Sequence, residues 1–324
     1  MKFIDTLVEG SALKDIYLCK FKQSAVTRNG KPYYNVILMD RTGTLEAKIW
    51  EPDSPGIADF DAMDYIHVFG EVNKFQGALQ ASIKRVQVAR EGEYNAADYI
   101  PVSKFDREEM KKSLIAVIST VKNTHLNQLL NKFFVEDTDL AEKFFMSSAA
   151  KNIHHSFIGG LLQHTLAVTR LCKYFVKAYP HLNHDLLITA ALLHDVGKVK
   201  ELSAFPQNDY TDDGQLLGHI VIGCEMIGQK AGEIPDFPPK LETELKHCIL
   251  AHHGEYEFGS PKKPALMEAM ALNFADNADA KLEVMVELIE SHDAKAAVPS
   301  SKTGEWFGFN RIFDSNLRKS GEWD

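Results

Sequence analysis

The sequence predicts a small β-barrel of five strands followed by an all-helical domain. Short runs of β-branched and aromatic residues recur between turn residues up to about position 90, and apolar residues with helical spacing dominate from position 106 onward. A length of 324 residues favours two domains, and 45% hydrophobic residues supply enough apolar material for two cores.

The strand-like runs are short and are separated by turn residues at 28–31, 40–43 and 75–77. They lie at 16–19, 33–39, 45–50, 65–72 and 79–88. Five short strands in about 80 residues fit a Greek-key barrel of the oligonucleotide/oligosaccharide-binding (OB) type. Another small barrel or sandwich would give a similar pattern, so the strand count leaves these alternatives open.

Helical spacing begins after a polar stretch at 91–97, where we place the end of the barrel. The helical segments expected are 106–146, 155–180, 184–196, 216–230, 239–253 and 264–290. The predicted division is a nucleic-acid-binding barrel at 1–95, a helical connector at 96–150, a second domain at 151–290 and an extension at 291–324. Aromatic residues cluster at 306–313, where they could cover the site, form an interface or pack in a core.

Composition excludes several classes of protein. No run of 18 apolar residues is present, so we expect no membrane span, and the first residues do not resemble a secretory signal. The cysteines Cys19, Cys172, Cys224 and Cys248 are far apart and form no CxxC pair. We therefore expect no disulfide framework or thiolate zinc site and place the protein in the cytoplasm.

The net charge of −9 argues against a generally basic surface, but the charge is unevenly distributed. Residues 13–50 carry seven Lys or Arg against three acids, and residues 74–90 carry four Lys or Arg and no acid. Between these two segments, residues 51–71 carry six acids. Aromatic residues alternate with these bases, as in surfaces that stack single-stranded nucleic acid. The nucleic-acid-binding residues that we expect are Tyr33, Tyr34, Trp50, Phe75, Lys31, Lys48, Lys84 and Arg85. The alternative is that the aromatics fill the barrel.

Ten of the 13 histidines fall between positions 154 and 253. Five otherwise apolar segments carry a His or an Asp, namely those around His164, His194-Asp195, His219, His252-His253 and Asp276. Burying so many polar side chains is costly unless a shared partner satisfies them, and divalent metal ions bind imidazole nitrogen and carboxylate oxygen. Asp195 is the natural bridging ligand, because a carboxylate can bind two metals and imidazole cannot readily do so.

The HDxGK sequence at 194–198, with the order His…His-Asp…Asp, resembles the HD superfamily of metal-dependent phosphohydrolases. Together with the segments 154–165 and 210–219 and a preceding OB-like barrel, the chain is similar to the YhaM-type 3′–5′ exoribonucleases. The resemblance implies one metal held by His164, His194, Asp195 and Asp276. It implies a second held by Asp195, His219 and either or both of His252 and His253. It also implies Mn²⁺, with Co²⁺, Fe²⁺ and Mg²⁺ as alternatives.

Three further residues receive roles in the predicted site. Lys198 could neutralise a non-bridging phosphate oxygen, or it could be a solvated lysine at a helix end. His155 could contact the phosphate or protonate the leaving 3′ oxygen, or it could only support another residue. Asp279, one turn after Asp276, could hydrogen-bond a ligand histidine. The predicted catalytic residues are therefore Asp195, Lys198 and His155.

The predicted function is a divalent-metal-dependent 3′–5′ exoribonuclease that converts single-stranded RNA to nucleoside monophosphates, with single-stranded DNA as a further substrate left open. Two alternatives remain: an HD-type phosphohydrolase of small nucleotides such as dNTPs or cyclic nucleotides, and a non-enzymatic nucleic-acid-binding factor. The sequence leaves homo-oligomer formation open.

Overall fold

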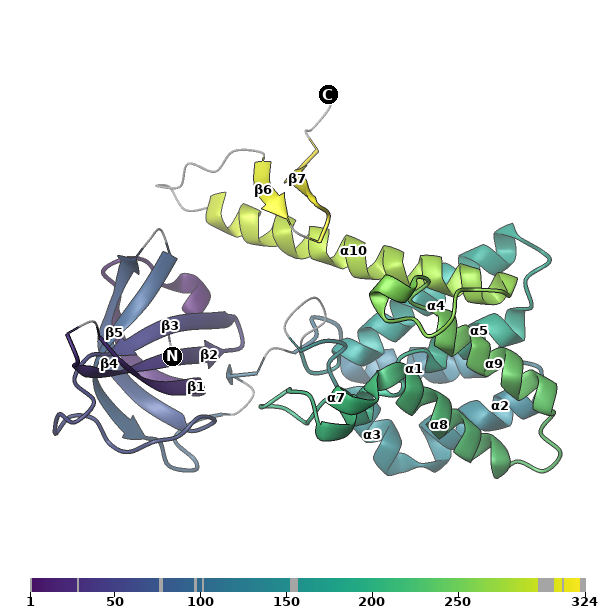
Figure 1. Ribbon diagram of the computed structural model, residues 1–324, viewed down its shortest axis with the longest axis horizontal. Helices are drawn as coiled ribbons and strands as arrows, with labels where there is room; N and C mark the ends of the chain where they lie inside the picture. The colour runs from purple at the N-terminus through teal and green to yellow at the C-terminus, as the bar shows by residue number, and fades with distance from the viewer. Residues whose placement is uncertain are drawn as a thin grey trace.

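The computed structural model describes residues 2–27, 29–75, 78–95, 98–100, 102–151, 157–296, 306–310 and 312–320, with the backbone alone for 291–296. Figure 1 shows a β-barrel and a helical domain side by side, joined by a short connector. Both predicted halves are therefore confirmed. None of the described helices is both long and apolar enough to span a membrane.

The N-terminal half is a closed barrel with the strand order β1-β2-β3-β5-β4, preceded by the 3₁₀ turn η1 (Ile4–Thr6). Its strands are β1 (Ala12–Val26), β2 (Pro32–Asp40), β3 (Gly43–Ile49), β4 (Tyr65–Phe75) and β5 (Ala78–Val88). The β3–β5 pair is parallel and the other pairs are antiparallel. Five strands in this order form an OB-type barrel, as predicted.

The barrel core follows from the alternation of side chains along each strand. Tyr17, Leu38, Ile66 and Val86 are fully buried in it. The long β1 closes the barrel because its first half pairs with β4 and its second half pairs with β2.

The chain remains on the barrel after β5 ends. Tyr94 stacks on Tyr65 with 3.7 Å between ring centroids, and Tyr99 meets Tyr65 edge-on at 5.0 Å. Tyr99 is buried with Leu18 and Met39 in a small cluster outside the main barrel core. The chain leaves the barrel after this cluster.

The helical half consists of ten helices among the described residues. They are α1 (Arg107–Ile118), α2 (Thr124–Asn131), α3 (Thr138–Met146), α4 (Gly160–Ala178), α5 (His184–Leu193), α6 (Lys198–Glu201), α7 (Asp212–Leu216), α8 (Gly218–Gly232), α9 (Pro239–Ala251) and α10 (Met267–Ala296). The π-helical turn η3 (Lys132–Glu136) joins α2 to α3, and the 3₁₀ turn η4 (Tyr256–Phe258) follows α9. Several helices begin at a polar residue that accepts a backbone N–H, including Asp106, Asn123 and Asn183.

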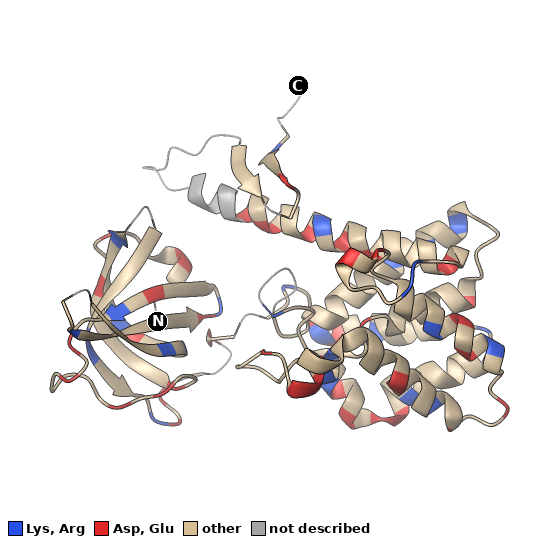
Figure 2. Cartoon of the chain, viewed as in Figure 1, with Lys and Arg blue, Asp and Glu red and all other residues tan. Residues whose placement is uncertain are grey.

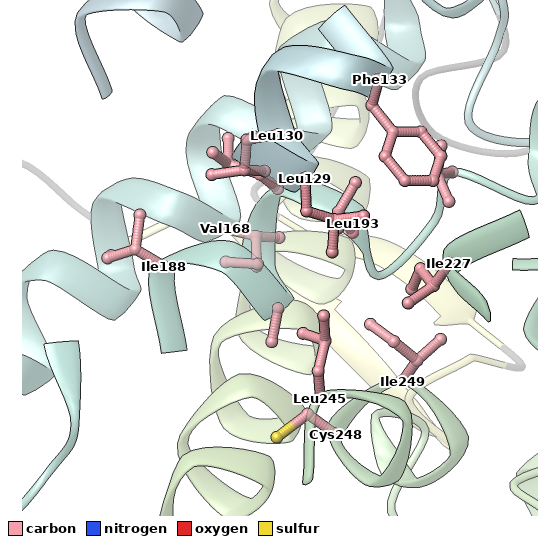
Figure 3. Packing of buried hydrophobic residues seen from close by; sticks show 14 of the residues in the cluster. Leu129, Leu130, Phe133, Val168, Ile188, Leu193, Ile227, Leu245, Cys248 and Ile249 are labelled. Atoms are coloured by element: carbon pink, nitrogen blue, oxygen red, sulfur yellow. The ribbon is translucent and has the colours of Figure 1, made fainter. Parts of the chain in front are cut away.

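Helix α5 is the centre of this domain. All of its residues from Leu186 to Leu193 are buried, and it packs against α2, α4, α9 and α10. Figure 3 shows Ile188 and Leu193 of α5 among Leu129, Val168 and Ile249 of the surrounding helices. Because His194 and Asp195 directly follow this apolar central helix, the helix delivers these two polar groups to the interior.

The C-terminal aromatic cluster forms a hairpin that the sequence analysis did not predict. Strands β6 (Trp306–Asn310) and β7 (Ser315–Arg318) pair antiparallel. Trp306 and Phe309 are each 61% exposed, so these two rings are not core residues.

Candidate metal centre

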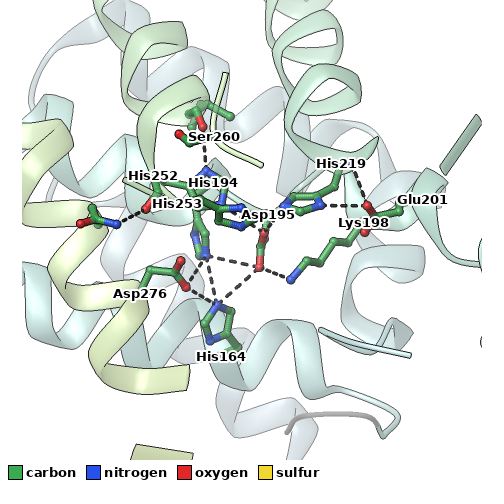
Figure 4. Close-up of polar contacts among 12 residues, drawn as sticks. His164, His194, Asp195, Lys198, Glu201, His219, His252, His253, Ser260 and Asp276 are labelled. Atoms are coloured by element: carbon green, nitrogen blue, oxygen red, sulfur yellow. Dashed lines mark hydrogen bonds and ion pairs between the residues drawn. The ribbon is translucent and has the colours of Figure 1, made fainter. Parts of the chain in front are cut away.

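Five helical elements bring the predicted polar residues to one place (Figure 4). His164 lies on α4, His219 begins α8, and Asp276 lies on α10. His194 and Asp195 follow α5, and His252 and His253 follow α9. These five elements are separate in the sequence, so the cluster forms only when the domain folds.

The first group of possible ligands is His164, His194 and Asp276, whose ligand atoms all lie within 4.8 Å of one another. The Nε2 atom of His164 is 3.1 Å from Nε2 of His194 and 3.2 Å from Oδ1 of Asp276. Both histidines are buried.

The second group is His219, His252 and His253, again with ligand atoms within 4.8 Å. The ring of His253 is 4.3 Å from that of His252 and 5.2 Å from that of His219, between centroids. Both adjacent histidines therefore face the same site.

Asp195 lies between the two groups. Its Oδ2 is 3.4 Å from Nε2 of His164 and 3.4 Å from Nε2 of His194. Its Oδ1 is 3.4 Å from Nε2 of His219 and 3.7 Å from Nε2 of His252. One carboxylate oxygen faces each group, which is the placement that a bridging ligand requires.

Two glycines allow the helices to approach this closely. A Cβ on Gly197 would lie 2.0 Å from the carbonyl oxygen of His219, so only glycine lets the turn after Asp195 contact α8. Gly254 ends the α9 segment with φ +81°, and a Cβ there would meet Asn273 at 2.5 Å. The Asn273 side chain donates to the carbonyl of His252 and fixes that turn.

Every one of the five histidines has its Nδ1 atom hydrogen-bonded away from the centre. The partners are Asp279 for His164 (2.7 Å), the Ala191 carbonyl for His194 (2.8 Å), Glu201 for His219 (2.9 Å), the Ile249 carbonyl for His252 (2.7 Å) and the Phe258 carbonyl for His253 (2.9 Å). A carbonyl only accepts, so Nδ1 carries the proton there and Nε2 offers its lone pair to the centre. The predicted hydrogen bond between Asp279 and a histidine of the site is confirmed: the Asp279 carboxylate accepts from His164.

Glu201 is a residue of the centre that the sequence analysis missed. It lies on α6 and also accepts the backbone N–H of His219 at 3.0 Å. Its pKa is lowered because hydrogen bonds from His219 outweigh the effect of burial, which alone would raise it. An acidic residue one turn after Lys198 was the available signal.

The electrostatics of the centre favour bound cations. Burial alone would raise the pKa of Asp195, but Lys198 and His194 hold it well below its usual range. Burial lowers the pKa of His252 well below its usual range, which keeps its ring neutral. In the described part of the chain, Oδ1 of Asp195 and Nε2 of His219 and of His252 are buried without a hydrogen-bond partner. Divalent ions satisfy such a donor set, so the residues fit a metal centre.

Lys198, one of the predicted catalytic residues, lies beside Asp195. The Lys198 ammonium lies 2.7 Å from Oδ2 of Asp195, at the edge of the first group. Its pKa is raised because Asp195 outweighs the effect of burial. His155 lies outside the described residues.

The predicted nucleic-acid-binding residues only partly share a face. Tyr33 and the exposed Trp50 stack with 5.2 Å between ring centroids, and Lys48 lies 5.6 Å from the Tyr33 ring. Tyr34 does not join them: it packs edge-on against Phe60 beside the barrel core, because neighbouring side chains on a strand point to opposite faces. The remaining residues are exposed at the end of β4, before β2 and on β5: Phe75, Lys31, Lys84 and Arg85.

Comparison with known proteins identifies both the helical domain and the whole chain. Residues 161–281 match the family described as HD domain. The second OB-fold domain of replication protein A from Methanococcus maripaludis is 16% identical with a TM-score of 0.23, covering 28% of this chain and 96% of that one. The strand order, rather than this distant likeness, defines the barrel.

The chain is also similar over most of its length to bacterial proteins named 3′-5′ exoribonuclease YhaM. It is 35% identical over 280 residues to the protein of Geobacillus sp. (strain WCH70), which covers 85% of each chain. It is 33% identical over 286 residues to that of Bacillus subtilis (strain 168), which covers 87% of this chain and 88% of the relative. At this identity and coverage, the chain belongs to the YhaM family of 3′–5′ exoribonucleases.

Proposed function

We propose that this protein is a divalent-metal-dependent 3′–5′ exoribonuclease that hydrolyses single-stranded RNA to nucleoside monophosphates. The observation that carries the proposal is the pair of histidine groups joined by Asp195, with one carboxylate oxygen toward each. Family membership supplies the direction of degradation and the RNA substrate, and single-stranded DNA is a further substrate to test.

The residues that would hold the metals are those of the two groups. His164, His194 and Asp276 would hold one ion and His219, His252 and His253 the other, with Asp195 shared. When bound, two such ions polarise a phosphodiester and lower the pKa of a water nucleophile. We propose Mn²⁺ for both positions, with Co²⁺, Fe²⁺ and Mg²⁺ as competitors in metal titrations.

The remaining residues of the site orient and balance charge. Asp279 and Glu201 hold the rings of His164 and His219 in a single orientation. Lys198 carries a positive charge at the edge of the centre, where it would neutralise a non-bridging phosphate oxygen. We keep His155 as a proposed phosphate contact or proton donor.

The barrel would hold the strand while its 3′ end is trimmed. The stacked pair of Tyr33 and Trp50, with Lys48 beside it, has the aromatic and basic composition of surfaces that bind single strands. We also propose a cytoplasmic location, because all four cysteines are free thiols. Homo-oligomer formation stays a prediction that light scattering can test.

The proposed function is tested with purified protein, Mn²⁺ and 5′-labelled RNA and DNA, with products resolved at single-nucleotide spacing. A ladder that shortens from the 3′ end is expected for RNA. The double variant His194→Ala/Asp195→Ala should abolish hydrolysis while it still binds RNA. Full activity of this variant, or turnover of dNTPs or cyclic nucleotides without RNA degradation, would contradict the proposal.

A further inference from the structure

A groove of about 840 Å³ lies between the barrel and the helical domain. From the barrel, Lys20, Phe21, Ile37, Thr44 and Met63 line it. From the helical domain it is lined by Lys151 and the segment around Tyr210. Figure 1 shows α7, which follows this segment, on the side of the helical domain that faces the barrel. No predicted nucleic-acid-binding residue lies in the groove.

A β-bulge brings two neighbouring residues of β1 to this groove. The pairing of β1 with β2 shifts between Cys19 and Phe21 and leaves Lys20 without a partner in the ladder. Cys19 is buried in the barrel core, so in a regular strand Phe21, two positions later, would point into the core as well. The bulge instead leaves Phe21 43% exposed and lets both Lys20 and Phe21 line the groove. Bulges commonly re-aim side chains in this way next to functional sites.

The groove continues the barrel face that carries Tyr33 and Trp50. On β1 and β2, Phe21 pairs with Ile37, Gln23 with Asn35 and Ala25 with Tyr33. Asn35 and Ile37 in turn face Lys48 and Glu46 of β3. The residues on either side of Ile37 in β2, Val36 and Leu38, are buried, so these pairs form one outward face.

This outward face offers partners for a nucleic acid strand along its length. It runs from the Tyr33–Trp50 stack, past the hydrogen bond between Lys48 and Asn35, to Phe21 and Ile37 at the groove. Its acid, Glu46, accepts a hydrogen bond from Gln80 of β5.

The other wall of the groove leads to the metal centre. Tyr210, 44% exposed, pairs with the chain at Leu202, and the next residue, Thr211, donates its backbone N–H to the carbonyl of Glu201. The Glu201 carboxylate holds His219. Tyr210 is therefore bridged to Leu202, the residue next to Glu201, which orients His219 of the second group.

The charges in the groove suit a phosphate backbone. Lys20 and Lys151 line it from opposite domains. The acid on the lining, Asp209, is ion-paired with Lys151, and that pairing lowers its pKa, with a smaller contribution from Lys20. The nearby acids at the start of α7 lie outside the groove lining (Figure 2).

We propose that this groove holds the 3′-terminal nucleotides of single-stranded RNA on their way from the barrel face to the metal centre. Phe21 and Tyr210 provide stacking surfaces from the two domains, and Lys20 contacts the phosphate backbone. The proposal rests on the proposed exoribonuclease function and adds the route of the strand. Together with the barrel face, it gives one continuous track from Tyr33 to the vicinity of His219.

Photo-crosslinking tests the route directly. Wild-type protein is mixed in EDTA with RNA of about 16 nucleotides, the upper range for one OB barrel, that carries 4-thiouridine at a single position. A label close to the 3′ end should crosslink to residues 20–21 and 207–210, and a label farther away should crosslink near Tyr33 and Trp50. Crosslinks of the 3′-proximal label that fall outside the groove would overturn the proposal.

Matched variants test how much the groove residues contribute to the affinity for RNA. Tyr210→Ala and Lys20→Gln should each weaken binding of the RNA of about 16 nucleotides at least fivefold, because one stacked base or one phosphate contact is lost. Tyr174→Ala on α4 and Lys240→Gln on α9, both highly exposed and outside the groove, are the controls and should match the wild type. If the groove variants also match the wild type, the proposed route is wrong.

The same preparations separate the two proposals. If the wild-type protein degrades RNA but the groove variants bind RNA as tightly as the wild type, only the proposed route is contradicted. Wild-type protein that degrades no RNA contradicts the proposed function, whatever the crosslinks show.

Discussion

At the scale of single residues, the centre depends on hydrogen bonds that turn each histidine ring. Five Nδ1 atoms are held by two carboxylates and three backbone carbonyls, and this leaves five Nε2 atoms directed at the metal positions. The carbonyl partners follow from the helix ends at which His194 and His252 lie. The carboxylate partners are side chains, so they can be removed one at a time.

Glu201→Gln is expected to raise the Mn²⁺ concentration required for half-maximal hydrolysis by about 10- to 100-fold, the usual effect of losing a carboxylate that orients a ligand histidine. Hydrolysis should recover at saturating Mn²⁺, because His219 itself remains. Glu225→Gln, an exposed change on α8, is the control. A Glu201→Gln enzyme with an unchanged Mn²⁺ dependence would show that Glu201 does not orient a ligand.

At the scale of elements, the contact between the turn after α5 and the start of α8 determines whether Asp195 reaches His219. Gly197→Ala should lower the free energy of unfolding by about 1–3 kcal/mol, because its Cβ would lie 2.0 Å from the His219 carbonyl oxygen. Thermal unfolding measures this, with Gly232→Ala at the end of the same α8 as control, since no atom lies within 4 Å of a Cβ there. Equal melting temperatures for the two variants would contradict the close packing.

The N-terminus of α5 is anchored by an acid whose effect depends on pH. Asp185 accepts the backbone N–H groups of Lys122 (3.0 Å) and Asn123 (2.6 Å) and a hydrogen bond from His184. Burial alone would raise its pKa, but these three hydrogen bonds lower it. A carboxyl whose pKa is depressed in the folded state stabilises that state above its ordinary pKa, and this stabilisation is lost as the pH falls through the folded value.

Asp185→Asn should therefore lower the free energy of unfolding by about 1–3 kcal/mol at pH 7. The difference from the wild type should shrink as the pH falls below about 4, the ordinary pKa of an aspartate. Urea unfolding across this pH range measures it, with the exposed Asp53→Asn on the barrel as control. A difference that does not change with pH would contradict an ionic origin.

The periodicity of apolar residues predicted most helices and strands, because each of them depends on a local pattern in the sequence. The five barrel strands and the main helical segments lie where alternation and helical spacing predicted them. The bulge at Lys20 and the hairpin β6–β7 were missed, because neither leaves a distinctive pattern of apolar residues.

At the scale of the whole molecule, the net charge of −9 means that RNA must be held by a few local bases. On the proposed track, these are Lys31 and Lys48 of the predicted barrel surface and Lys20 of the groove, since Lys151 is paired with Asp209. Three phosphate contacts on a single strand, by Lys20, Lys31 and Lys48, predict a slope of about −2 for log K against log salt concentration.

Anisotropy titrations with labelled RNA in EDTA measure this slope. Lys48→Gln should make it shallower by about 0.7, the contribution of one phosphate on a single strand, and the distant Lys240→Gln should leave it unchanged. A slope steeper than about −6 would mean that a wider basic surface binds the strand.

The sequence by itself determined the two domains, their order and the histidines and aspartates at the centre. It could do so because periodicity reports secondary structure and because buried His and Asp residues in apolar segments need a shared partner. Only the tertiary structure decided what depends on contacts between distant segments. These are the Nε2 orientation set by Glu201 and Asp279, the separation of Tyr34 from Tyr33, and the exposure of Phe21 toward Tyr210. Side-chain direction depends on register and packing, which bring together residues far apart in the chain.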